Sequence, residues 1–330
     1  MAQTSTADVA PATPASAVRP RTAPTTQDRT CVVISFDVEE HHRIEAAAGL
    51  DVGTHGRAYY RDRMEAVTFW LLEQLAARDV RATFYVVGEL AELSKSLVRT
   101  IAEAGHEVGS HGWDHRRVLV MKKEEFRRDL RQSKDALEQA TGTAVIGYRA
   151  PTFSIVRETS WALQILAEEG YQYDSSIYPV RHDRYGIPDA PLTPFVVPTP
   201  AGPILEIPPL TLRWMWMNWP VGGGGYFRLL PNWLMYRGIA RLQRRAETSP
   251  AMLYFHPWEF DHGQLELPLT WLSRLRTYVG IKGSRERLVR LLEGGYHFKT
   301  AADVAQRLTE SGGAVPEFDL LRHAREHVHA

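Results

Sequence analysis

The alternation of strand-like and helix-like segments is the feature that most constrains how this chain can fold. Short β-rich runs alternate with segments of helical spacing, and the connections between them are short. Such alternation is typical of a mostly parallel sheet built from right-handed β-α-β units. We therefore predict an α/β fold with its sheet either open or closed as a barrel. The expected strands are residues 31–36, 82–87, 107–109, 144–148, 171–173, 251–255 and 296–298.

The middle of the chain is less regular. Residues 188–209 are rich in proline and contain two β-like runs, at residues 195–197 and 204–207, which predict a hairpin inserted in the barrel. Residues 213–220 read RWMWMNWP and precede the four glycines Gly222–Gly225. No Lys-Ser/Thr follows these glycines, so they do not form a phosphate-binding loop. We predict an aromatic-lined lid, whose tryptophans suit either stacking on sugar rings or packing in the core.

Composition predicts one folded region between two tails. Residues 1–29 are rich in Ala, Pro, Thr and Ser and lack apolar periodicity, which predicts a disordered tail. Residues 30–310 contain the alternating segments and form the predicted domain, and residues 311–330 are expected to be a flexible tail.

Charge and cysteine content exclude several classes of protein. Lys+Arg and Asp+Glu number 39 each, so the balance gives no reason to expect a nucleic-acid partner or an anionic membrane surface. The single cysteine, Cys31, excludes an internal disulfide framework. No apolar run approaches the ~20 residues of a spanning helix, and the N-terminus lacks the pattern of a signal peptide. We expect a cytoplasmic protein that acts on cytoplasmic precursors or at the inner membrane face. The segment Arg228–Arg245, with five arginines, suits either peripheral membrane contact or an amphipathic packing helix, the simpler interpretation.

Ionisable residues follow the predicted strands at equivalent places. In parallel α/β barrels the loops after the strands converge on one mouth, so these side chains are expected to meet there. They are Asp37 and Glu39 after the first strand, His111 and His115 after the third, Arg149 after the fourth, Asp174 after the fifth, and His256 after the strand at residues 251–255. Each has an ordinary structural explanation by itself, but their clustering predicts a functional site.

The histidine pair indicates a metal. His111 and His115 are four positions apart, and side chains so spaced meet on one side of a helical turn or tight loop. Two imidazoles placed in this way suit a borderline-soft cation such as Zn²⁺.

Several motifs resemble those of the polysaccharide deacetylases with the NodB-homology fold, in the same order, over residues 32–308. The wording of residues 35–40 (SFDVEE), 222–231 (GGGGYFRLLP) and 255–261 (FHPWEFD) is most similar to the subgroup associated with exopolysaccharide and exosortase gene clusters. Residues 205–310 would include the part specific to this subgroup. The matching motifs are Ser35-Phe36-Asp37, Ser110–His115, Arg149-Ala150-Pro151, Tyr173–Ser176 and Leu253–Pro257.

The resemblance implies a fold and a set of roles. The fold is a distorted (β/α) barrel of about seven parallel strands with the inserted hairpin and lid. Asp37 would be the catalytic base and Arg149 would orient it, while His256 would be the general acid, held by Asp174 or another acid. His111 and His115 would bind the metal. Val38 replaces the family's usual second aspartate, so the third ligand is expected to be Glu39, with Glu40, His41 and His42 as alternatives.

The implied reaction is the hydrolysis of an N-acetyl group on an aminosugar. The cofactor would be a divalent cation, Zn²⁺ by preference, with Co²⁺, Mn²⁺ or Ni²⁺ as alternatives. A backbone N–H near Thr152 or Phe153 would stabilise the oxyanion, and Trp113 and Trp258 would contact the substrate. The substrate would be an acetylated polymer or a lipid-linked oligosaccharide. A deformylase, a cyclic-amide hydrolase and a carbohydrate-binding pseudoenzyme are the alternative functions.

Overall fold

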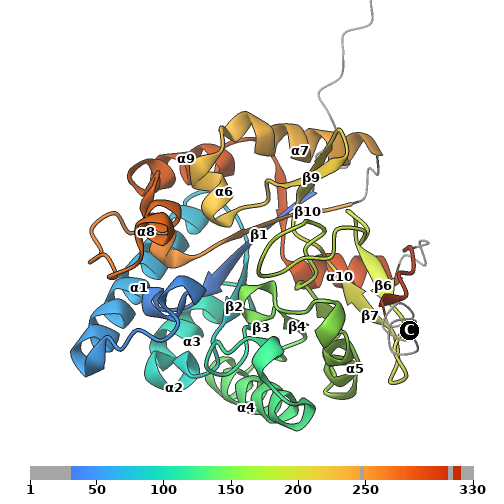
Figure 1. Cartoon of the computed structure of the whole chain (residues 1–330), viewed down its shortest axis with the longest axis horizontal. Coiled ribbons are helices and arrows are strands. Elements are labelled where there is room, and N and C mark those ends of the chain that lie inside the picture. The colour runs from blue at the N-terminus through green and yellow to red at the C-terminus, as the bar shows by residue number, and fades with distance from the viewer. Residues whose placement is uncertain (1–30, 246–248, 311–314, 321–330) are drawn as a thin grey trace, which may run out of the picture.

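A single curled sheet organises the molecule (Figure 1). The computed structural model describes residues 31–245, 249–310 and 315–320, and the predicted tail over residues 1–29 lies outside them. The main sheet has nine strands, in the order β10-β1-β2-β3-β4-β5-β7-β6, with β11 paired beside β1. The strands of this sheet are β1 (Cys31–Val38), β2 (Thr83–Val86), β3 (Glu107–Ser110), β4 (Gly147–Tyr148), β5 (Tyr173–Asp174), β6 (Phe195–Val197), β7 (Ile204–Glu206), β10 (Ala251–Phe255) and β11 (His297–Lys299).

The pairing confirms the predicted parallel barrel type. Every neighbouring pair in the main sheet is parallel except β6–β7, which is antiparallel. The expected hairpin therefore exists, but β7 is not an insertion beside the barrel, since it pairs directly with β5. Isolated bridges from Pro209 and Gly223 to β10 partly close the gap between the two ends of the sheet.

Helices surround the sheet in Figure 1, and α1, α3, α4 and α5 contact one another in succession along its outer face. The expected helix over residues 90–104 is divided in two at Ser94, whose backbone leaves the helical region. Helix α6, which precedes β10, and helix α8, which follows it, were not predicted. The helices are α1 (Gly53–Ala76), α2 (Leu90–Leu93), α3 (Lys95–Glu103), α4 (Lys123–Thr141), α5 (Trp161–Glu168), α6 (Gly224–Leu229), α7 (Asn232–Arg245), α8 (Trp271–Tyr278), α9 (Ser284–Leu292) and α10 (Ala301–Glu310). Short 3-10 turns are η2 (His41–Arg43), η3 (Glu45–Ala47), η4 (Val118–Val120), η5 (Pro151–Phe153), η6 (Arg157–Thr159), η7 (Pro257–Phe260) and η8 (Ile281–Gly283).

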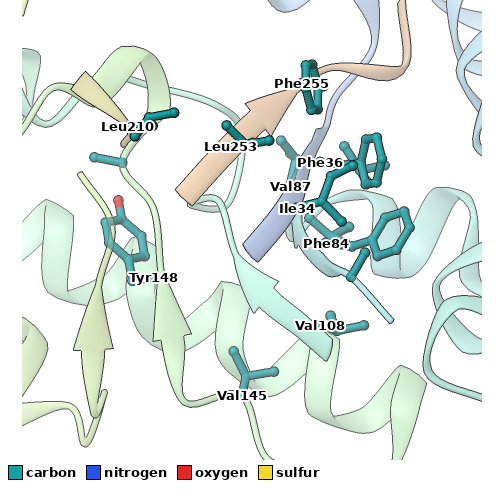
Figure 2. Packing of buried hydrophobic residues seen from close by; sticks show 14 of the residues in the cluster. Ile34, Phe36, Phe84, Val87, Val108, Val145, Tyr148, Leu210, Leu253 and Phe255 are labelled. Atoms are coloured by element: carbon teal, nitrogen blue, oxygen red, sulfur yellow. The ribbon is translucent and has the colours of Figure 1, made fainter. Parts of the chain in front are cut away.

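Strand alternation divides the core into an outer and an inner layer. Side chains such as Ile34, Phe36 and Phe84 point toward the helices (Figure 2), where the Phe36 and Phe84 rings lie 5.1 Å apart. Their neighbours in the sequence point to the inside of the curled sheet, because successive residues of a strand face opposite sides. Cys31, Val33, Tyr85, Tyr173 and Met252 form this inner cluster with residues of α10.

Helix α10 closes one end of the barrel and leaves the other end for a site. Its first N–H groups donate to the interior strands, from Ala301 to Thr83 Oγ1 at 2.8 Å and from Ala302 to Glu107 Oε2 at 2.8 Å. These acceptors satisfy helix-terminal N–H groups that have no intrahelical partner. The parallel strands begin at this closed end, so their C-terminal residues lie at the opposite, open end.

The predicted lid is a separate two-stranded antiparallel sheet, formed by β8 (Thr211–Trp214) and β9 (Met217–Pro220). None of its residues lines the cavity described below. Of the predicted lid and its glycines, Gly224 and Gly225 at the start of α6 line the cavity.

The predicted C-terminal tail is packed where the structure describes it. Val196 of β6 donates to Pro316 O, and Phe318 N donates to Val196 O, both at 2.9 Å. The Phe318 ring contacts Phe195, and Leu320 is fully buried. Residues 315–320 therefore differ from a flexible tail, and the rest of the range 311–330 lies outside the described residues.

Candidate active site

A cavity of about 230 Å³ lies at the open end of the barrel. It is lined by side chains from the ends of β1, β3, β4 and β10, as the pattern of ionisable residues predicted. The predicted site residues that reach it are Asp37, Glu39, His111, His115, Thr152, Phe153, His256 and Trp258.

Glu39, His111 and His115 form the candidate metal group. One ligand atom from each lies within 4.8 Å of the others. His111 Nδ1 lies 2.7 Å from Arg149 O, so this nitrogen donates its hydrogen and Nε2 is left with a free lone pair toward the group. Such an outer hydrogen bond is what orients a metal-binding imidazole. Burial lowers the pKa of His111 to about 4, which keeps the ring in the neutral form that binds metals.

Glu39 fits the metal because one of its oxygens lacks any other partner. Its carboxylate is buried, and Oε2 lies against His115 Nε2 without a hydrogen bond of acceptable geometry. Burial alone would raise the pKa of Glu39, but the neighbouring histidines lower it below its usual range. A buried anionic oxygen beside two imidazole nitrogens is a suitable donor set for a divalent cation.

The alternative metal ligands make contacts outside the metal group. Glu40 forms an ion pair with Arg43 at 2.5 Å. The His41 ring stacks on Trp258 with a centroid distance of 5.0 Å, and burial lowers its pKa to about 3. Neither these two residues nor His42 belongs to the metal group found in the described part of the chain. Glu39 is therefore the third ligand that the geometry favours.

Arg149 holds Asp37 in place. The fully buried guanidinium donates from one nitrogen to Asp37 Oδ1 and Ser35 Oγ, both at 2.7 Å. Its other nitrogens donate to Ser175, and the group lies 4.1 Å from the centre of the Tyr85 ring. A buried cation with every side occupied can hold one carboxylate in one orientation, which is what a base requires.

His256 lies beside Asp37 and is held by Glu259. His256 Nε2 is 3.8 Å from Asp37 Oδ2 and 3.9 Å from Glu39 Oε1. Its Nδ1 lies 2.7 Å from Glu259 Oε1. Burial alone would lower the pKa of His256, but the hydrogen bond and charge of Glu259, together with the charges of Glu39 and Asp37, raise it to about 9. The imidazole is thus kept protonated, as a general acid must be.

Glu259 and Arg228 are site residues that the sequence analysis did not name. Arg228 Nε donates to Glu259 Oε2 at 2.7 Å, and both side chains are buried. Trp258 lies between these groups and the ligands, stacking on His256 and donating from Nε1 to Glu39 Oε1 at 3.3 Å. The acid three residues after His256, with Pro257 between, is a helix-capping pattern that could have identified Glu259.

The structure does not bring Asp174 or Trp113 to the cavity. Asp174 lies opposite Glu206 on β7, and Ser176 Oγ donates to its Oδ1 at 2.5 Å. Asp174 therefore cannot hold His256, and the carboxylate that does so is Glu259. Trp113 is half-buried outside the cavity, although its backbone N–H donates to Asp129 Oδ2 at 3.0 Å and so positions the loop between the two histidines.

Three residues in the loops that line the cavity have a left-handed backbone conformation. His115, Thr152 and Phe153 have φ values of 67°, 57° and 51°. Residues other than glycine rarely adopt this left-handed region, and such outliers gather at functional sites. Phe153 N–H already donates to Ala150 O at 3.0 Å, so of the two expected oxyanion donors only Thr152 N–H is suitable.

Comparison with protein families matches two regions of the chain. Residues 26–173 match a model described as "Polysaccharide deacetylase", and residues 175–306 match a "Domain of unknown function (DUF3473)". The first region contains the motifs of Asp37, the histidine pair and Arg149. Residues 26–173 belong to the polysaccharide deacetylase family. The pairing of the two matches is that of the exopolysaccharide-associated type, as the resemblance implied, and the second match begins before the expected boundary at residue 205.

Curated relatives of this chain are similar to it over short stretches. A peptidoglycan deacetylase of Helicobacter pylori is 30% identical over 107 residues, which is 32% of this chain and 36% of the relative. A peptidoglycan-N-acetylglucosamine deacetylase of Bacillus cereus is 30% identical over 95 residues, 28% of this chain and 34% of the relative. These matches span about a third of the relatives' length.

Solved structures share the fold over most of the chain. A putative polysaccharide deacetylase from Mycobacterium smegmatis has a TM-score of 0.56 at 20% identity, covering 88% of this chain and 93% of that one. The Puue allantoinase has a TM-score of 0.59 at 17% identity, covering 88% and 95%. At this identity the likeness shows the fold alone. Within the described residues, no helix is long and apolar enough to cross a membrane.

Proposed function

We propose that this protein is a metal-dependent amide hydrolase that removes N-acetyl groups from aminosugars of a polysaccharide or its precursor, in exopolysaccharide biosynthesis. One observation carries the proposal. A Glu-His-His group lies beside a carboxylate, Asp37, that is fixed by a buried arginine, and beside a histidine, His256, that is fixed by a buried glutamate.

Glu39, His111 and His115 would hold a divalent cation, by preference Zn²⁺, with Co²⁺, Mn²⁺ and Ni²⁺ as alternatives. When bound, such an ion polarises an amide carbonyl and acidifies a water molecule toward neutral pH. The burial of Glu39 and His111 strengthens both effects, because charges interact more strongly in a low-dielectric environment.

The chain's own residues would move the protons. Asp37 accepts the proton of the attacking water, and Arg149 keeps this carboxylate oriented. His256 donates a proton to the departing amine, since an amine leaves readily only once it is protonated. Glu259 fixes the tautomer and direction of His256. Thr152 N–H would donate to the oxyanion, and Trp258 and Phe153 would form the walls that receive the sugar.

The decisive experiment measures metal content and acetate release on the same samples. Wild type is compared with His111→Ala/His115→Ala, with Asp37→Asn, and with His262→Ala, an exposed control. The proposal expects about one metal per chain in wild type, Asp37→Asn and the control, and acetate release from chito-oligosaccharides only in wild type and the control. A chelator should abolish activity, and Zn²⁺, Co²⁺ or Mn²⁺ should restore it.

The other outcomes distinguish the alternatives. Metal binding without acetate release would favour a formylated aminosugar or a cyclic amide, which are assayed in parallel, and a lipid-linked acetylated oligosaccharide is tested beside the free polymer. Binding of oligosaccharide without turnover of any amide would favour a carbohydrate-binding pseudoenzyme. Absence of metal after reconstitution would overturn the mechanism.

A further inference from the structure

The β8–β9 hairpin exposes an apolar tip that no described part of the chain covers. The exposed fractions are 54% for Trp214, 71% for Met215, 78% for Trp216 and 48% for Met217. Large apolar side chains gathered on a surface in this way mark an interaction site, whereas single exposed ones are ordinary. The tip itself makes no contribution to the core, since its base alone, at Thr211 and Leu212, is buried.

Helix α7 packs beside this hairpin (Figure 1), and its exposed face is basic. Met235, Ile239 and Leu242 are buried in the core, which confirms the predicted packing helix. The opposite side of the helix exposes Trp233, Arg237 and Arg244, with Arg241 half-exposed between them. Positions 233, 237, 241 and 244 follow the three- and four-residue spacing of one helical face.

The charged side chains of the hairpin and of α7 are all positive. Residues 207–245 contain no Asp or Glu but six arginines, in a protein whose charges otherwise balance. Arg228 is buried against Glu259 and does not contribute to the surface. Among the described residues, no ion pair involves Arg213, Arg237, Arg241 or Arg244, so their charge is available to a partner.

We propose that the β8–β9 hairpin tip and the outer face of α7 form a docking surface for an anionic lipid bilayer. Tryptophan is enriched at membrane–water interfaces, and methionine adapts to disordered acyl chains. Arginines beside such an apolar tip attract anionic headgroups, at roughly 1 kcal/mol each. A second copy of the chain fits less well, because a symmetric contact would bring this basic face against itself.

The surface is connected to the active-site rim. Asn218, at the centre of β9, donates from its amide to Pro179 O at 2.8 Å and to Pro188 O at 2.9 Å. The segment between these prolines supplies His182, Arg184 and Tyr185 to the cavity. Docking would therefore hold the cavity close to the bilayer. The inference stands on surface residues alone and does not depend on the amide hydrolysis proposed above.

The test is co-sedimentation of the full chain with extruded vesicles of phosphatidylcholine, with and without 30 mol% phosphatidylglycerol. Two variants remove the surface, Trp214→Ser/Met215→Ser/Trp216→Ser and Arg237→Gln/Arg241→Gln/Arg244→Gln. Matched controls are Trp271→Ser, on the exposed side of α8, and Arg274→Gln/Arg290→Gln. We expect wild type and controls to bind the anionic vesicles, with affinity falling on the order of 100-fold in the arginine variant and with added salt.

Several results would overturn the proposal. One is that wild type stays in the supernatant with both vesicles, and another is that both surface variants sediment as wild type does. Sedimentation-velocity runs at several protein concentrations address self-association, since a dimer lost in the hairpin variant would assign the tip to a second copy instead. Tryptophan fluorescence is an independent measurement. Insertion of the tip should shift the emission to shorter wavelength in wild type but not in the variant that lacks Trp214 and Trp216.

Discussion

Two residues that we propose to act in the site, His115 and Thr152, have unfavourable backbone conformations. His115 and Thr152 have positive φ, which costs a non-glycine residue roughly 1–2 kcal/mol. Under the proposed function, His115 would supply a ligand atom and Thr152 would donate its backbone N–H to the oxyanion. The surrounding packing overcomes this cost, as expected where a side chain is needed for function.

The metal role of His115 can be separated from its structural role. We expect His115→Asn to lose metal affinity by at least tenfold while keeping its stability within about 1 kcal/mol, because asparagine tolerates the left-handed region. Titration with Zn²⁺ and thermal unfolding of the apo-protein measure the two quantities. An equal substitution at the exposed His262 is the control. Unchanged metal affinity in the first variant would remove His115 from the ligand set.

We predict that Glu259 contributes to catalysis by positioning His256. We expect Glu259→Gln to lower kcat by about 10- to 100-fold, since a hydrogen bond to a charged group contributes about 1.5–3 kcal/mol. KM and metal content should change little, because Glu259 contacts neither the ligands nor the open part of the cavity. Glu266→Gln, which alters an exposed ion pair, is the control. An unchanged kcat would contradict the assignment of Glu259 as the residue that positions His256.

At the scale of elements, β5 and β7 meet at a buried pair of carboxyl groups. Asp174 and Glu206 are fully buried and directly opposite each other in the register. Burial, and for Glu206 also the nearby Asp174, raises the pKa of both groups, that of Asp174 to about 6. One proton is therefore retained between the strands at pH values where the unfolded chain has lost both.

This pair should make stability fall as pH rises. Both folded pKa values lie above the unfolded ones, so the stabilisation is complete below the unfolded pKa of about 4 and is lost as pH rises through the folded values. Glu206→Gln can donate to Asp174 and still accept from Ile177 N, without a proton to lose. We expect the variant to gain stability relative to wild type between pH 5 and pH 8.

Denaturant unfolding at several pH values measures this difference. Glu286→Gln, at an exposed position on α9, should follow wild type at every pH. A variant whose stability falls with pH as steeply as that of wild type would show that the shared proton lies elsewhere.

At the scale of the whole molecule, the chain closes its own sheet edge. Strand β6 ends the order of the main sheet, and residues 315–320 pair with it and cover Phe195. An unpaired edge strand would otherwise be a site of aggregation.

Ending the chain at Glu310 should therefore expose this edge. We expect a loss of about 3 kcal/mol in unfolding free energy, because Phe318 and Leu320 leave their contacts with the core, and increased aggregation. A chain ending at Leu320 is the control and should behave as the full chain. Equal stability of the two truncated chains would show that the packing of residues 315–320 contributes nothing.

The sequence alone determined the parallel α/β fold, the positions of the main strands and the residues that meet at one end of the barrel. These features depend on local patterns, which are apolar alternation, helical spacing and the place of an ionisable residue after a strand. Asp37, His111, His115, Arg149 and His256 were all identified from such positions, and the structure brings them together. Gly142, with φ of 70°, ends α4 as a glycine after a helix commonly does, which is also a local rule.

Only the tertiary structure decided which side chains pair. Asp174 follows a strand as Asp37 does, but the register of β5 and β7 places it against Glu206, and Glu259 holds His256 instead. The aromatic run over residues 214–219 suited a lid or a core equally well, and the structure exposes it as a hairpin tip. The reason is physical. A residue's type and spacing limit what it can bind, whereas its partner depends on strand register and on contacts between residues far apart in the chain.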